Sequence, residues 1–210
     1  MSYPAGYQIE RERPRQRRSG EAARLKAVQA ATDLFALSGY GGTSIADVAA
    51  KTGLSQSGLL HHFPSKAALL TAVLEHRSKE DDEFLFGGES PPLGWDAFDA
   101  LVSLVARNST RLKWVGLFVR LSAEATEPGH PAHQWLLDHY ASLRRWLGEA
   151  LEHGKLDGTV SQDAPVEILV NNTIAILDGI QQQWMCAPGS FSMVTQFRSF
   201  VEGTKATWSK

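Results

Sequence analysis

The most informative stretch of the sequence runs Ile45-Ala46-Asp47-Val48-Ala49-Ala50-Lys51-Thr52-Gly53-Leu54-Ser55-Gln56-Ser57-Gly58-Leu59. Two short helices that cross steeply need a small residue where they touch, a turn residue that tolerates positive φ four positions later, and apolar residues facing inward. Ala49 meets the first demand and Gly53 the second, while Ile45, Val48 and Leu59 belong to the inward set. The stretch predicts a helix-turn-helix. Taken alone, it leaves a generic helical hairpin as the alternative.

The sequence on both sides of this stretch predicts an all-α chain. Apolar residues recur at three- and four-residue steps from Glu21 to Ser38, and Ser55 and Ser65 are placed to cap helices over 56–62 and from 66 to about 79. An acidic stretch at 79–83 and a Gly/Pro-rich loop follow. Further helices are expected near 95–108, 111–125, 131–153, 163–186 and 190–208.

The charge of the chain is divided unevenly along its length. Residues 1–77 hold ten Lys/Arg against six Asp/Glu, and residues 78–210 hold eleven against seventeen. A positive module favours a polyanion, because neutralised phosphates release their counterions. Residues 1–19 lack apolar periodicity and contain two prolines and five arginines, so we expect a disordered basic arm.

The run Thr43-Ser44-Ile45-Ala46-Asp47-Val48-Ala49, followed by Leu59-Leu60-His61-His62-Phe63-Pro64-Ser65-Lys66-Ala67-Ala68-Leu69-Leu70, resembles the N-terminal domain of TetR-family regulators. The resemblance covers about residues 24–74. It implies a three-helix DNA-binding domain at 20–77 and a helical bundle at 78–210 for regulation and dimerisation. It also implies a homodimeric repressor whose recognition helices enter successive major grooves ~34–36 Å apart on a palindromic operator. The resemblance also implies that an unidentified small-molecule effector releases the repressor from its operator.

The resemblance places the helix over 56–62 in the major groove. Gln56 can pair with adenine and Ser57 with several bases, while Gly58 either lets the backbone approach or loosens the helix. Hydroxyls, helix-start amides, a ring nitrogen and an ammonium are the candidates for phosphate contacts. The full set of DNA-binding candidates is Thr43, Ser44, Ser55, Gln56, Ser57, Gly58, His61 and Lys66.

One position departs from the family pattern. Many relatives carry Tyr where this chain has Leu60, and Leu60 offers no hydroxyl to a phosphate. The basic arm is able to offset this loss by contacting the minor groove or the phosphates. A solvated tail without ordered contacts is the equally weighted alternative. The arginines concerned are Arg11, Arg13, Arg15, Arg17 and Arg18.

The acidic region is rich in aromatic residues at helical spacing. Such residues usually form core, but those beside polar groups are candidates for a ligand cavity. We expect an effector site among these helices. For Asp178, a role as a surface or capping group is weighted equally with a ligand contact. The candidate ligand-binding residues are Trp114, Phe118, Arg120, Trp135, His139, Asn171, Asn172 and Asp178.

The last two predicted helices carry more apolar residues than terminal helices of a monomer need. Ile168, Ile176, Ile180, Phe191 and Phe200 are examples, and Gly179 would allow close helix approach. The resemblance implies that this pair forms a four-helix dimer interface.

Other functional classes find no support in the sequence. It holds no Gly-rich phosphate loop, nucleophile elbow or metal-ligand spacing, so we expect neither an enzyme nor a bound cofactor or metal. A helical protein-interaction adaptor that does not bind DNA is the alternative function. A single Cys186 and the lack of long apolar runs or a signal peptide predict a cytoplasmic protein without a membrane span.

Overall fold

The computed structural model describes residues 14–87 and 90–210, and for residues 14–19 it describes the backbone only. Over these ranges the protein forms nine helices and no strand, which confirms the predicted all-α fold. The helices are α1 (Pro14–Ser38), α2 (Ile45–Thr52), α3 (Gln56–His62), α4 (Lys66–Phe86), α5 (Asp96–Ser109), α6 (Leu112–Glu124), α7 (His133–Asp157), α8 (Val166–Cys186) and α9 (Met193–Trp208).

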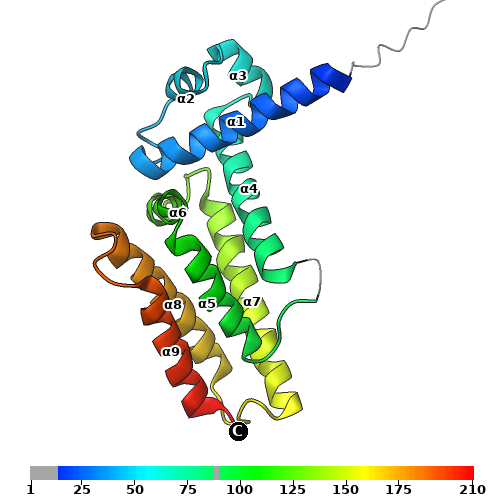
Figure 1. The fold of residues 1–210 in the computed structure, drawn as a ribbon, viewed down its shortest axis with the longest axis vertical. Coiled ribbons are helices and arrows are strands. Elements are labelled where there is room, and N and C mark those ends of the chain that lie inside the picture. Colours follow the sequence, from blue (N-terminus) through cyan, green and yellow to red (C-terminus); the bar gives the residue numbers. More distant parts are fainter. Residues whose placement is uncertain (1–13, 88–89) are drawn as a thin grey trace, which may run out of the picture.

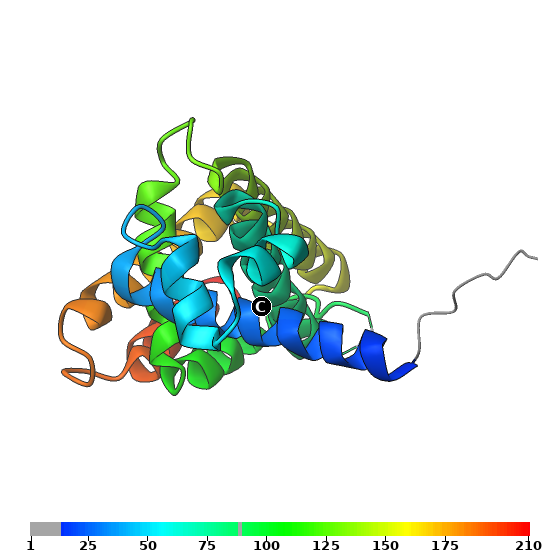
Figure 2. The same ribbon diagram turned by 90° about the horizontal axis from the view of Figure 1, so that it is seen from above.

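The molecule is elongated, with two parts joined by α4 (Figure 1). The first part, here called the head, holds α1, α2, α3 and the start of α4. The second part, the body, holds α5 to α9, and the later turns of α4 run down its side (Figure 1). Seen from above, α2 and α3 lie at the end of the molecule, with the start of α1 projecting to one side (Figure 2).

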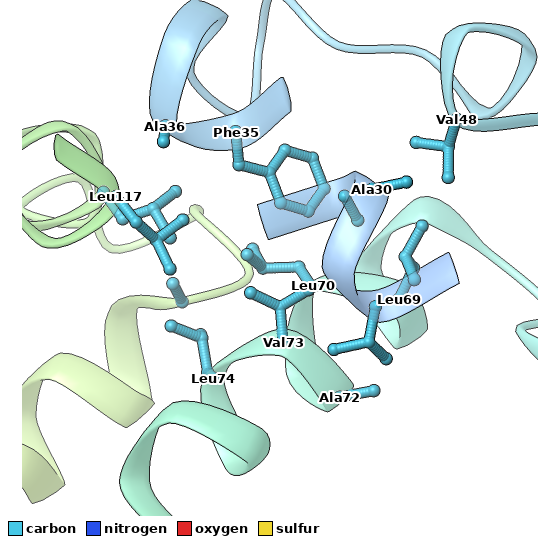
Figure 3. Packing of buried hydrophobic residues seen from close by; sticks show 14 of the residues in the cluster. Ala30, Phe35, Ala36, Val48, Leu69, Leu70, Ala72, Val73, Leu74 and Leu117 are labelled. Atoms are coloured by element: carbon cyan, nitrogen blue, oxygen red, sulfur yellow. The ribbon is translucent and has the colours of Figure 1, made fainter. Parts of the chain in front are cut away.

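The core of the head continues into the body. Figure 3 shows the Phe35 ring of α1 directed toward Leu70 and Val73 of α4, with Leu117 of α6 nearby, and these four side chains are buried. A second buried cluster fills the space between α5, α7, α8 and α9, with Phe98 and Phe197 fully buried in it. Burial of each such large apolar side chain contributes ~1.5–3 kcal/mol to the stability of the fold.

Two predicted boundaries are wrong. Residues 14–19, assigned to the disordered arm, form the first turns of α1, because Pro14 stands at the start of the helix, where its missing N–H and fixed φ are tolerated. Arg11 and Arg13 lie outside the described residues. The acidic stretch at 79–83 continues α4 to Phe86, since all of its charged residues except Asp82 form ion pairs, and Gly87 ends the helix at φ +50°.

Candidate DNA-binding surface and body cavity

A capping box begins α2. The backbone N–H of Asp47 donates to Ser44 Oγ (3.1 Å), and the backbone N–H of Ser44 donates to Asp47 Oδ2 (2.8 Å). These two bonds satisfy donors that a helix start leaves free. The Ser44 hydroxyl also donates to Asp47 Oδ2 (2.6 Å), and this bond, together with the one from the Ser44 N–H, holds the pKa of the Asp47 carboxyl below its ordinary value. At the other end, Gly53 at φ +70° turns the chain toward α3.

The helix α3 presents a polar outer face on an apolar anchor. Its N-terminus is capped by Ser55, whose Oγ accepts the backbone N–H of Gly58 (3.0 Å). Leu59 is fully buried against the head core. Gln56, Ser57 and His61 are exposed, as the sequence predicts for residues that contact bases and phosphates. They stay candidates for DNA contact.

The absence of a side chain at position 58 has a local explanation. A Cβ at this position would come 3.1 Å from Ser55 Oγ, the atom that caps the helix. Glycine therefore leaves the capping bond undisturbed. The hydroxyls of Ser44 and Ser55 already serve as caps, but both residues are exposed, so they remain accessible to a phosphate.

Two of the candidate phosphate ligands have structural roles instead. Thr43 is buried, and its hydroxyl donates to Gly39 O (2.9 Å). The Lys66 ammonium donates to Tyr40 O and Thr43 O (2.9 Å each) and lies 4.2 Å from the centre of the Tyr40 ring. Their polar groups hold the loop between α1 and α2 on α4. The sequence does not reveal this, because the partners are backbone carbonyls 23 and 26 residues away.

Ionic contacts dock the head on the body. Asp33 of α1 lies 2.9 Å from Lys51 Nζ of α2 and 2.7 Å from Lys113 Nζ of α6. Nearby, the backbone N–H of Tyr40 donates to Glu124 Oε2 of the body (3.0 Å). The carboxylate of Asp33 thus connects three helices, and its two lysine partners outweigh burial and lower its pKa.

Gly39 leaves the space that the Glu124 carboxylate occupies. Gly39 adopts φ +72°, and a Cβ there would lie 2.0 Å from Glu124 Oε1. No side chain fits that space without moving Glu124. Gly39 is therefore required both by the turn and by the docking of the head.

Three arginines link α4 to α5 and α6. Arg77 of α4 is buried, donates to Trp114 O (2.7 Å) and lies 3.6 Å from Asp81. Arg107 of α5 contacts Asp81 (3.2 Å), and Arg111 pairs with Glu80. Burial alone would raise the pKa of Glu80, but the hydrogen bond and charge of Arg111 hold it below its ordinary value. The pKa of Asp81 is raised because burial outweighs its arginine partners.

A cavity of about 170 Å³ lies in the body beside this cluster. It is bounded by α4, α5, α6, α7 and α8, with Met193 at the start of α9. Its walls are mostly apolar, as in small-molecule sites. The aromatic lining residues are Phe86, Phe118, Trp135 and Trp146, and the polar ones are Arg77, Ser78, Asp81, Asp82, Asn108, His139, Ser142, Asp178 and Gln181.

Four of the eight predicted ligand residues line this cavity. Trp135 stacks on His139 with 5.2 Å between ring centres, and Phe118 meets His139 edge-on at 5.4 Å. Burial, with a smaller effect of the Arg77 charge, lowers the pKa of His139 to about 4. Asp178 accepts the Tyr140 hydroxyl (2.7 Å), and burial raises its pKa.

The other four predicted ligand residues lie elsewhere. Asn171 and Asn172 are exposed, and Asn171 accepts from Arg144 Nε (3.0 Å) outside the cavity. Arg120 is exposed, because it lies two residues after Phe118 and so points to nearly the opposite face of α6. Trp114 is buried toward the head, where its Nε1 donates to Glu80 Oε2 (3.2 Å).

Sequence reasoning missed the contribution of α4 to the cavity. Arg77 stands at the predicted end of the head, and Asp81 and Asp82 lie in the acidic stretch beyond the predicted end of the fourth helix. Asn108 of α5 was missed because a lone asparagine in a helix carries no distinguishing pattern. The continuous charge pairing of 76–83 at four-residue spacing is the signal that predicts a longer α4.

The last two helices divide their apolar residues between three environments. Some are buried within the protomer, and Leu177 and Ile180 line the cavity. Ile168 and Ile176 remain 59% and 39% exposed on the outer face of α8. These last two are the apolar residues that the protomer itself does not cover.

The comparisons with known proteins agree with this arrangement. The family model described as "Bacterial regulatory proteins, tetR family" matches residues 27–73, which span the head from α1 to α4. TtgR of Pseudomonas putida, an HTH-type transcriptional regulator, is 23% identical over 198 residues, covering 90% of this chain and 92% of TtgR. RutR of Escherichia coli is 44% identical over 54 residues, 25% of this chain and 26% of RutR.

The head of this chain is a TetR-family domain. Solved structures share the fold along nearly the whole chain. A TetR transcriptional regulator from Chloroflexus aurantiacus J-10-FL superposes with a TM-score of 0.74 at 21% identity, covering 90% of this chain and 95% of that one. FadR from Bacillus subtilis, solved in complex with stearoyl-CoA, gives 0.73 at 13% identity, covering 87% and 97%.

Similarity to TetR-family regulators along most of the chain identifies the protein as a DNA-binding transcriptional regulator and not an enzyme. The helix-turn-helix reading of 45–59 is confirmed, and the generic hairpin is set aside. In the described part of the chain, no helix is long and apolar enough to cross a membrane.

Proposed function

We propose that this TetR-family protein is a repressor that leaves a palindromic operator when a small molecule occupies the body cavity. Residues 20–77 bind DNA and residues 78–210 sense the ligand and dimerise. The observation that carries the proposal is the path of α4. Its start packs on α1 in the buried head core, which also holds Leu59 of the recognition helix, and its later turns supply Arg77, Asp81 and Phe86 to the cavity wall.

The polar face of α3 supports the DNA-binding half. Gln56 and Ser57 lie exposed in its first turn, where side chains of recognition helices reach base edges. His61 and the exposed starts of α2 and α3 are placed to contact phosphates. Thr43 and Lys66 are left out of this set because their polar groups are already bonded.

Linkage supports the sensing half. A ligand that binds better to one arrangement of the two heads must change DNA affinity by the same factor, typically ~1–3 kcal/mol. In a dimer, a small tilt of α4 changes the spacing of the two α3 helices. The FadR complex with stearoyl-CoA supports the expectation that a protein of this fold accommodates a small molecule.

Dimerisation through α8 and α9 is part of the proposal. Ile168 and Ile176 form, with the small Ala175 and Gly179, an outer stripe on α8 at helical spacing. Small residues between apolar ones allow two helices to approach closely. Such a pair in each protomer makes a four-helix interface.

The test is a binding assay on duplexes from the promoter of the protein's own gene. We expect a dimer to protect two half-sites one helical turn apart, and Gln56→Ala to reduce affinity by ~1–3 kcal/mol with altered preference at one base pair per half-site. Gln134→Ala, at an exposed glutamine of α7, is the matched control. Binding of no duplex even at low salt would instead support the protein-interaction adaptor.

A further inference from the structure

The polar lining of the body cavity is unbalanced in charge. Among the described residues that line it, three are aspartates and one, Arg77, is a fixed cation. Arg77 is not available to a ligand: it is buried, donates to Trp114 O, pairs with Asp81 and lies over the Phe118 ring. An anionic ligand would therefore enter without a partner, which makes its burial costly.

Two of the three aspartates face the cavity without a basic partner. In the described part of the chain, no Lys, Arg or His lies within ion-pair distance of Asp82 or Asp178. The charge of Arg144, which lies over the Tyr140 ring, reaches Asp178 from beyond that distance. Asp82 is exposed at the end of the cavity formed by α4. Asp178 receives the Tyr140 hydroxyl on Oδ2, which leaves its carboxylate able to accept another donor.

A third acceptor lies deeper in the wall. The side-chain Oδ1 of Asn108 is buried and has no hydrogen-bond donor within the described residues. A buried acceptor without a donor costs free energy that a ligand N–H or O–H would recover. Asn108 belongs to α5 and Asp178 to α8, so the two acceptors come from different helices that line the cavity.

The aromatic lining fits a cation as well as an apolar body. Trp135 and Phe118 are packed around His139, and Trp146 meets Phe86 edge-on at 5.3 Å. The faces of such rings attract ammonium groups. The aliphatic remainder, with Leu101, Leu104 and Ile180 among it, suits a hydrocarbon or aryl group.

We infer that the effector of this protein is a compact, mostly apolar molecule that carries a protonated amine, and that Asp178 is the residue that selects the amine. This inference rests on the proposed function, since it names the ligand class of the same cavity. The apolar part fills the space between Phe118, Trp135 and Trp146, and the ammonium lies against Asp178. Carboxylates and phosphates are excluded because the lining offers no free cation.

The test compares three probes that share one skeleton: 4-phenylbutylamine, 4-phenyl-1-butanol and 4-phenylbutyrate. At pH 7.5 they are cationic, neutral and anionic. Isothermal titration calorimetry on the intact protein measures the Kd of each. We expect the amine to bind about tenfold tighter than the alcohol, and the carboxylate to bind most weakly.

The same titrations on Asp178→Asn identify the selecting residue. The asparagine keeps an acceptor for the Tyr140 hydroxyl, so the fold is expected to hold, which the thermal midpoint checks. We expect the amine to lose about tenfold in affinity while the alcohol stays within about twofold. Asp163→Asn, at an exposed aspartate in the loop before α8, makes the same change of charge and should alter neither value. The same titrations on Asp82→Asn measure independently whether the other aspartate without a basic partner contributes to amine binding.

Each contrary result overturns the inference. Equal or tighter binding of the alcohol or the carboxylate removes the charge preference, and an unchanged amine Kd in Asp178→Asn removes the assigned residue. Absence of binding by all three removes the ligand class. Failure of the proposed function looks different: the amine binds and depends on Asp178, but it does not release the protein from its operator.

Discussion

The Arg77 guanidinium lies over the Phe118 ring, with 4.9 Å between its central carbon and the ring centre. Because Arg77 belongs to α4 and Phe118 to α6, this contact fastens the helix that reaches the head to the wall of the cavity. Phe118 in turn meets His139 of α7. A ligand against Phe118 therefore acts one contact away from α4.

Replacing Arg77 by methionine should destabilise the protein strongly. The substitution removes the donor to Trp114 O and one of the two arginines that pair with Asp81, Arg107 being the other, and a buried acceptor left without its donor costs about 1–3 kcal/mol. Urea unfolding measures the change. Lys79→Met removes an exposed ion pair of the same helix and should cost less than about 1 kcal/mol. Similar losses for both variants would contradict the role given to burial.

Leu60→Tyr should strengthen operator binding. Leu60 is 41% exposed on α3, and a tyrosine hydroxyl there would add a hydrogen bond to a phosphate, worth about 0.5–1.5 kcal/mol. The salt dependence of binding should not change, because a neutral hydroxyl releases no counterion. Leu60→Phe, which adds the ring without the hydroxyl, separates the two contributions. A gain in affinity by the phenylalanine variant equal to that of the tyrosine variant would exclude the hydroxyl as its source.

The stability of the protein should fall in mild acid because of His139. Its pKa is lowered from 6.5 to about 4 in the folded state, so between these values the unfolded chain binds a proton that the folded protein does not. Above pH 6.5 the group is neutral in both states and has no effect. Acidification from pH 6.5 to 4 should cost up to ~3 kcal/mol from this residue.

The pH dependence is isolated by difference. Urea unfolding of wild type and His139→Phe across pH 4–7 should show a shallower loss in the variant. His153→Phe, at a half-exposed histidine of the same helix, is the control and should follow wild type. Parallel curves for wild type and His139→Phe would show that the folded protein takes up the proton as readily as the unfolded chain.

Gly39→Ala should cost more than the same change at another left-handed glycine. At Gly158, φ is +81° and no atom lies within 4 Å of an added Cβ, so Gly158→Ala reports the backbone strain alone, about 1 kcal/mol. At Gly39 the Cβ also displaces Glu124 and breaks its bond to the Tyr40 N–H. Chemical denaturation of both variants gives the comparison. Adding Glu124→Ala to Gly39→Ala should recover part of the difference.

Ile176→Glu should separate the protomers. A charge in the proposed α8 interface cannot be buried without a partner, so the dimer should dissociate at micromolar concentration while the protomer stays folded. Sedimentation velocity measures the oligomeric state. Leu156→Glu, at a side chain that is 87% exposed at the end of α7, should remain a dimer. An unchanged dimer in the Ile176 variant would place the interface elsewhere.

Sequence reasoning was most reliable where local chemistry sets the structure. The caps at Ser55 and Ser65 and the turn at Gly53 are confirmed, because each depends on residues within four positions. The predicted end of α4 is too early, since the acidic residues that extend the helix pair with Arg107 and Arg111, which lie about 30 residues away in the sequence.

The predicted ligand residues show that the helical phase alone does not determine which side chains reach the cavity. Asn171 lies seven residues before Asp178 and so shares its face of α8, but two turns place it roughly 10 Å along the axis, outside the cavity. Trp114 shares a face with Phe118, yet one turn puts it at the junction with the head. The direction in which a side chain points follows from helical periodicity, whereas its position along the helix relative to the cavity depends on how the helices are packed.

The bond between Asp33 and Lys113 sets a condition for recombining this protein with its relatives. A chimera cut at residue 77 would carry Asp33 into the new molecule and leave Lys113 behind with the old body. The transplanted domain would still recognise its own operator, since α3 travels with it. Its response to the foreign sensor would depend on whether the recipient offers a lysine or arginine at the start of its sixth helix.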